Sequence, residues 1–171
     1  MGKGSVQQTT VSVTQTDTDF YGDEWGYSSI NSNALGYTWA KYNSASDFRS
    51  GGYDRTWGGQ AASWGGSETP AYIKLYQSVT VNVINSTGTL TIGWPPSYSV
   101  SPTKTSSTAT WSSESATNVD VLGAEHQTTE ISEADIQGGQ ITSFVYNDSA
   151  DIKIGSTIYR PASSVRFTNG L

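Results

Sequence analysis

Residues 72–94 read YIKLYQSVTVNVINSTGTLTIGW, and the alternation of apolar and polar side chains in this stretch decides the fold class. Alternate positions place the apolar side chains on one face of an extended chain, which predicts a β-strand. The alternation resumes after the segment Asn85-Ser86-Thr87-Gly88. We therefore predict a long hairpin across residues 72–94, with Gly88 at a turn position that requires a positive φ.

Shorter alternating segments follow this hairpin, each bounded by turn residues, and helical periodicity is nearly absent. Many short strands at regular spacing are typical of antiparallel sandwiches and barrels. The predicted fold is an all-β antiparallel two-sheet sandwich of the jelly-roll or Ig-like kind. Its predicted core consists of Val11, Val13, Ile73, Leu75, Val79, Val81, Val83, Leu90, Ile92, Trp94, Val119, Val121, Ile141, Ile152 and Ile154.

The chain has 171 residues, enough for one domain with its own core, and we predict a single β-sandwich domain over residues 1–171. Residues 1–5 are expected to be flexible or to come from an expression start, since they lack the apolar centre of a signal peptide. Only 14% of the residues are charged, whereas Gly (18), Tyr (10) and Trp (6) are plentiful. This balance is common in secreted β-proteins and virion fibres, so we expect an extracellular or cell-surface protein whose leader is absent from this sequence.

Charge and residue usage exclude several function classes. The formal net charge is −6 with a pI near 4.5, and Lys and Arg are scattered, which disfavours nucleic acid and anionic membranes as partners. No apolar run is long enough to span a bilayer, so we expect no stable membrane insertion. The absence of Cys excludes disulfides, thiolate catalysis and Cys-based zinc sites.

Residues 20–70 are rich in Gly, Ser, Asn, Tyr and Trp with little alternation, which predicts long aromatic and glycine-rich loops. Trp57-Gly58-Gly59 recurs as Trp64-Gly65-Gly66, and an aromatic ring beside two glycines suits stacking on a pyranose ring. These segments resemble loops of some small bacterial mannose-binding lectins, which implies sugar binding. The alternative is that both tryptophans lie in the core, beside tight glycine turns. The candidate ligand-binding residues are Tyr21, Trp25, Trp39, Tyr53, Trp57 and Trp64.

An acidic run precedes this region. Its spacing Asp-x-Asp-x-x-Gly matches the first half of an EF-hand loop, but Tyr21 and Ser28 stand where that loop needs oxygen ligands. A calcium site of another kind remains open, as does a solvated acidic turn after a strand that ends near Thr16. The candidate metal ligands are Asp17, Asp19, Asp23 and Glu24.

Catalysis is not expected. His126 is the only histidine, and no serine-nucleophile or metalloprotease motif occurs. The chain resembles the family-11 xylanases in size, low charge and Tyr/Trp/Gly/Ser/Thr content, which implies a small jelly-roll glycosidase, but the Glu-Tyr-Tyr and Glu-Gly-Tyr types of motif are missing. The carboxylates available for such an enzyme are Glu68, Glu114, Asp120 and Glu125.

The sequence therefore predicts a non-catalytic secreted or surface-displayed module that recognises carbohydrate through the aromatic loops. The alternative is a self-associating subunit of a surface fibre or particle, because the uncharged alternating segment 5–14 could pair with the sheet edge of another subunit. A β-pore-forming toxin that refolds residues 97–121 is a weaker alternative, since their outward face is not apolar.

Overall fold

The computed structural model describes residues 6–16, 21–30, 33–43 and 54–168. These residues form ten strands and no helix, and so none of their segments is a helix that could cross a membrane. The strands are β1 (Val6–Thr16), β2 (Tyr21–Ser29), β3 (Ala34–Asn43), β4 (Asp54–Trp64), β5 (Tyr72–Ile84), β6 (Ser99–Pro102), β7 (Ser106–Ser112), β8 (Val121–Ile131), β9 (Gln140–Ile154) and β10 (Thr157–Thr168).

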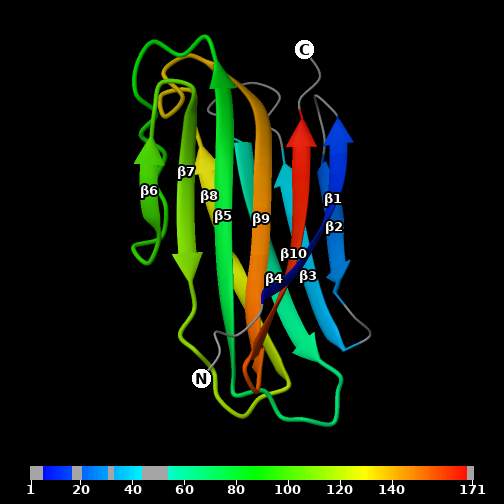
Figure 1. Ribbon diagram of the computed structural model, residues 1–171. Helices are drawn as coiled ribbons and strands as arrows, with labels where there is room; N and C mark the ends of the chain where they lie inside the picture. Colours follow the sequence, from blue (N-terminus) through cyan, green and yellow to red (C-terminus); the bar gives the residue numbers. More distant parts are fainter. Residues whose placement is uncertain (1–5, 17–20, 31–32, 44–53, 169–171) are drawn as a thin grey trace.

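Two sheets face each other and form a sandwich, as predicted (Figure 1). Sheet A has six strands in the order β1-β10-β9-β5-β7-β6, and sheet B has four strands in the order β2-β3-β4-β8. All pairs are antiparallel except β1 with β10, which run parallel. The all-β two-sheet fold class is therefore confirmed.

Strand β5 alternates between buried and partly exposed residues along its whole length, as its sequence pattern predicts. Its buried side chains turn towards sheet B, and its other side chains form part of the outer face of sheet A. The neighbouring strand β9 pairs with β5 from Tyr72↔Lys153 to Ile84↔Gln140, with one shift in register between Asn82 and Val83. These two strands lie at the centre of sheet A.

The core between the sheets consists of two clusters of buried residues. The larger, which we call the Phe144 cluster, contains Ala40, Val79, Val81, Val83, Leu90, Ile92, Ile131, Ile136, Ile141, Phe144, Tyr146, Val165 and Phe167. The smaller, which we call the Trp64 cluster, contains Ala34, Ala62, Trp64, Ile73, Leu75, Ala150 and Ile152. Most of the described residues that the sequence predicts as core belong to these clusters, whereas the side chains of Val11 and Val13 lie outside the described part of the structure.

The predicted hairpin over residues 72–94 is wrong in its second half. Residues 89–94 form no strand, and β5 pairs instead with β7 and β9. The left-handed residue after β5 is Asn85, with φ 60°, and not Gly88. Leu90 and Ile92 nevertheless bury their side chains in the Phe144 cluster, because alternation buries apolar residues even where the backbone joins no sheet.

The prediction of long loops over residues 20–70 is also wrong, because the described part of this region forms β2, β3 and β4. Their alternation is hidden because the inward positions carry small residues, such as Gly36, Ala40 and Ala62. A Cβ atom at Gly26 would lie 2.9 Å from the carbonyl oxygen of Ser164 in sheet A. Small inward residues therefore let sheet B lie close against β10.

Two predicted core residues test where the core ends. Leu90 is fully buried, whereas the predicted core position Val121 is 61% exposed on β8, so its assignment is wrong. We expect Leu90→Ala to lower the free energy of unfolding by about 2–5 kcal/mol, because it leaves a cavity. Val121→Ala should change the free energy of unfolding by no more than about 0.5 kcal/mol. Urea unfolding of both variants measures the difference, and equal effects would contradict the described core.

Candidate functional site

The six aromatic residues predicted to bind a ligand do not lie in loops where they are described. Tyr53 lies outside the described residues, and Tyr21 and Trp25 lie in β2 with side chains outside the described part. Trp39 lies in β3, and Trp57 and Trp64 lie in β4. The sequence therefore identifies a group of aromatic residues but assigns it to the wrong kind of segment.

Trp64 is a core residue. Its side chain is 6% exposed, and its ring centroid lies 5.1 Å from that of Tyr159 in sheet A. A Cβ atom at Gly66 would lie 2.7 Å from the indole Nε1 of Trp64, so this glycine leaves the space that the ring occupies. Stacking on a sugar needs an exposed ring face. The core alternative for Trp64 therefore fits the structure better than the ligand-binding prediction.

Trp39 and Trp57 lie on the outer face of sheet B, because their neighbours along β3 and β4 are buried against sheet A. The more exposed rings on this face are Tyr27 and Tyr37, which are 45% and 36% exposed. They are a cross-strand pair of β2 and β3, with ring centroids 5.3 Å apart. Neither tyrosine is among the residues predicted to bind a ligand, although each follows a glycine in a segment rich in aromatic residues.

The side chains of the four predicted calcium ligands lie outside the described part of the structure. Asp17 and Asp19 lie outside the described residues, and Asp23 and Glu24 lie in β2, with side chains outside the described part. Elsewhere in the described part of the chain no group of three or more acidic or histidine side chains could hold a metal ion. The calcium site therefore stays a prediction. The carboxylates considered for a glycosidase, Glu68, Glu114, Asp120 and Glu125, are all exposed.

A row of polar side chains crosses the inner face of sheet A between the two core clusters. Ser163, Asp148 and Gln77 are register partners on β10, β9 and β5, and all three are buried. We call these three residues the polar row. Thr38 of sheet B hydrogen-bonds to the side chain of Ser163, and the phenol of Tyr98 donates to Gln77 Oε1 at 2.7 Å. Polar groups thus link both sheets at the middle of the core.

His126 of β8 extends this network. Its Nδ1 lies 2.9 Å from the Tyr98 oxygen, and its ring lies 5.7 Å from that of Trp111. Because the single phenol proton of Tyr98 goes to Gln77, we assign the proton of the His126–Tyr98 bond to Nδ1. Burial lowers the pKa of His126 to about 4 and raises the pKa of Tyr98 to about 12. Both side chains are therefore neutral at pH 7.

Asp148 is the least satisfied member of the polar row. Its side chain is 5% exposed, and neither carboxylate oxygen accepts a hydrogen bond of ordinary geometry from a described residue. Burial raises the pKa of Asp148 to about 7, although the nearby Thr38 and Gln77 offset part of that effect. The sequence holds one signal of this row, since Gln77 is the only polar residue among the inward positions from Ile73 to Val83.

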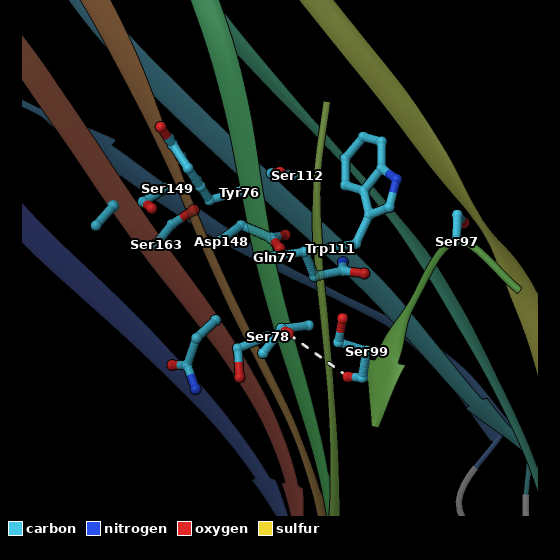
Figure 2. Close-up of a pocket in the computed structure, with 13 residues that line it drawn as sticks. Tyr76, Gln77, Ser78, Ser97, Ser99, Trp111, Ser112, Asp148, Ser149 and Ser163 are labelled. Carbon is cyan, nitrogen blue, oxygen red and sulfur yellow. Dashed lines mark hydrogen bonds between the residues drawn. The ribbon is translucent and has the colours of Figure 1, made fainter. Parts of the chain in front are cut away.

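A hollow of about 670 Å³ lies on the opposite, outer face of sheet A (Figure 2). Three of its segments are residues 76–78 of β5, 110–112 of β7 and 147–149 of β9, which pair side by side. Its other lining residues are Ser97, Ser99, Ala162 and Ser163. None of the six aromatic residues predicted to bind a ligand lines this hollow.

Comparisons with known proteins leave the chain without a family. No model of a protein family matches it, and no curated protein matches it. One solved structure with a weak likeness is AggA, the major subunit of aggregative adherence fimbriae type I from Escherichia coli. The two chains share 8% sequence identity, and their alignment covers 92% of this chain and 89% of AggA, with a TM-score of 0.28. These comparisons therefore assign neither a family nor a function to the chain.

The glycines of the Trp-Gly-Gly repeats have a structural role that a substitution tests. A Cβ atom at Gly58 would lie 2.5 Å from the backbone oxygen of Trp39, whereas a Cβ atom at Gly93 would have no neighbouring atom within 4 Å. We expect Gly58→Ala to lower the free energy of unfolding by about 1–3 kcal/mol, because the backbone of β3 must move. Gly93→Ala, the control, should stay within about 0.5 kcal/mol in the same thermal or urea unfolding experiment.

Asp148 and His126 change the stability in opposite directions with pH. Between the ordinary aspartate pKa of 3.8 and about 7, folded Asp148 holds a proton that the unfolded chain releases, so stability falls as the pH rises. Between about 4 and the ordinary histidine pKa of 6.5, the unfolded chain holds a proton that folded His126 releases, so stability rises with pH. The two contributions oppose each other across this shared range.

Asp148→Asn should therefore change the pH profile of stability. Above pH 7 the variant should be more stable than the wild type, because it buries no unpaired charge. As the pH increases from 4 to 6.5, the free energy of unfolding of the variant should increase relative to that of the wild type by on the order of 1 kcal/mol per pH unit. The reason is that Asp148 no longer opposes the contribution of His126. Urea unfolding across this range measures it, and Asp120→Asn, at an exposed aspartate, is the control. Parallel profiles for Asp148→Asn and the wild type would contradict a raised pKa.

Proposed function

We propose that the protein is a non-catalytic structural subunit of an extracellular or cell-surface fibre or particle, and that its copies associate by exchanging strand β1. The observation that carries this proposal is the nature of the β1 edge. Strand β1 lies at the end of sheet A with β10 as its neighbour, and its eleven residues, Val6–Thr16, include no charged residue and no proline. An edge strand that contains no charge and no proline can pair with the sheet of another chain.

The other sheet edges have features that discourage such pairing. Strand β6, at the opposite edge of sheet A, has four residues and ends at Pro102. The edge strands of sheet B, β2 and β8, carry acidic residues such as Asp23, Glu24 and Glu125. Charges, proline and short length are the usual means by which proteins protect sheet edges. The difference between β1 and these edges supports association at β1 rather than elsewhere.

Exchange of β1 between copies preserves the pairing of β1 with β10. Strand β1 pairs with β10 in an unbroken parallel register from Val6↔Ile158 to Thr16↔Thr168, and the next strand, β2, belongs to the other sheet. If β1 of one copy occupies the same position beside β10 of another, every register pair is kept, which is why such exchange is a low-cost route to assembly. Repetition from copy to copy produces a fibre when the contact does not close on itself.

The composition supports an extracellular or surface location for such a subunit, since hydroxyl-rich, weakly charged, cysteine-free chains are common among surface fibres. Carbohydrate recognition through Trp57 and Trp64 is not part of this proposal, because Trp64 is buried.

Paired cysteine substitutions test the exchange, because the chain has no cysteine of its own. Thr14 and Arg166 are register partners, so Thr14→Cys and Arg166→Cys on separate chains are expected to form an interchain disulfide when the two chains are refolded together and oxidised. Ala162→Cys, opposite Thr10, is the control partner, because Thr14→Cys lies four residues out of register with it. Gel electrophoresis without reductant measures the product.

Electron microscopy of the concentrated wild type completes the test. Fibres or particles, together with the in-register disulfide, support the proposal. A monomer at all concentrations, or assemblies in which the Thr14→Cys chain and the Arg166→Cys chain form no interchain disulfide, would overturn it.

A further inference from the structure

The hollow in sheet A is formed by side chains that turn away from the core. Gln77 and Asp148 are buried against sheet B, so the residues on either side of each turn outward by strand alternation. Register then assigns Thr110 and Ser99 to the outer face as well, since Thr110 pairs with both Ser78 and Ser99. The outward lining consists of Tyr76, Ser78, Ser99, Thr110, Ser112, Asn147, Ser149 and Ala162.

This lining offers many free hydrogen-bonding groups. Thr110 Oγ1 donates to the Ser99 backbone at 3.5 Å, a long contact (Figure 2). The side chains of Ser78, Ser112, Asn147 and Ser149 make no hydrogen bond to any described residue. Hydroxyls both donate and accept, and the amide of Asn147 does the same with separate atoms. The hollow can therefore match a ligand that presents several donors and acceptors at once.

The same geometry excludes other ligand classes. Strands β9, β5 and β7 are each paired on both sides, so an extended peptide cannot add to them as a further strand. The one charged residue in the lining is Asp148, whose carboxyl group is buried on the inner face. A phosphate, a carboxylate or an ammonium group would therefore lose its hydration without meeting an opposite charge. A neutral ligand rich in hydroxyl groups fits the hollow best.

An aromatic ring at one side of the hollow is held in position. The phenol of Tyr76 donates to Asp151 Oδ2 at 3.0 Å, and Asp151 is in turn paired with Arg160 at 2.7 Å. The Arg160 guanidinium also lies 5.9 Å from the ring centroid of Tyr76. A ring that is already fixed loses little entropy when a ligand packs against it. The Lys74 ammonium lies 5.4 Å from the same ring centroid, so Tyr76 closes one side of the hollow as a fixed residue beside the hydroxyl groups of the lining.

We infer that this hollow is a binding site for a neutral saccharide. The sugar lies across β9, β5, β7 and β6 and hydrogen-bonds to the side chains of Asn147, Ser78, Thr110 and Ser99. The hollow's volume of about 670 Å³ is in the range of small-molecule sites, about 300–1,000 Å³. This site is separate from the β1 edge and from the aromatic residues that the sequence selects. The inference does not depend on strand exchange.

Isothermal titration calorimetry with glucose, galactose, mannose, N-acetylglucosamine and their β-linked oligomers tests the inference. We expect saturable binding of at least one of these sugars in the millimolar range or tighter. Thr110→Val, which removes a hydroxyl and keeps the shape of the side chain, should weaken that binding about three- to tenfold, as the loss of one hydrogen bond does. Circular dichroism verifies that the variant is folded.

Ser99 and Ser101 provide a matched control on one strand. Both are exposed and share the outer face of β6, but only Ser99 lines the hollow, so Ser99→Ala should weaken binding and Ser101→Ala should not. Absence of saturable binding by every sugar would overturn the inference. Binding that survives Thr110→Val and is lost in Tyr37→Ala would also overturn it, because the sugar would then lie on sheet B. Neither result bears on the cysteine test of β1.

Discussion

The antiparallel pairing of β5 with β9 is the constraint on which the other elements depend. These are the longest described strands, with 13 and 15 residues, and they occupy the centre of sheet A. Their inward side chains contribute to both core clusters, and their outward side chains form the middle of the hollow. Substitutions on their inward positions therefore act mainly on stability, and those on their outward positions act mainly on what the surface can bind.

The polar row shows that this core is not built for stability alone. Burying an unpaired carboxyl group is costly, and the fold meets that cost by keeping Asp148 largely protonated below pH 7. A neutral apolar residue of similar size at this position would be expected to stabilise the protein. The row instead joins both sheets, directly through Thr38 of β3 and through Tyr98 to His126 of β8, which fixes how the sheets lie on each other. Specific alignment and maximal stability are thus in competition here.

The sequence predicts sheet A better than sheet B for a physical reason. In β5 large apolar residues alternate with polar ones, so burial is visible in the residue types. In β3 and β4 the inward positions hold residues such as Gly36, Thr38 and Gly58, whose burial follows from the close approach of the sheets and not from their hydrophobicity. Long-range pairing decides those positions. The same limit applies to the hollow, since residues 76–78, 110–112 and 147–149 meet only after the strands pair.

The position of Gln77 opposite Asp148 has one more consequence, which concerns how the strands find their alignment. A slip of one residue would turn the apolar side chains of β9 to solvent, and alternation alone prevents it. A slip of two residues keeps every side chain on its correct face, so alternation cannot detect it. Such a slip would move Asp148 from Gln77 to a position opposite Leu75 or Val79, where the carboxyl group would face an apolar neighbour. The polar row thus distinguishes the native register, in which Asp148 and Gln77 are opposite each other, from registers that are shifted by two residues.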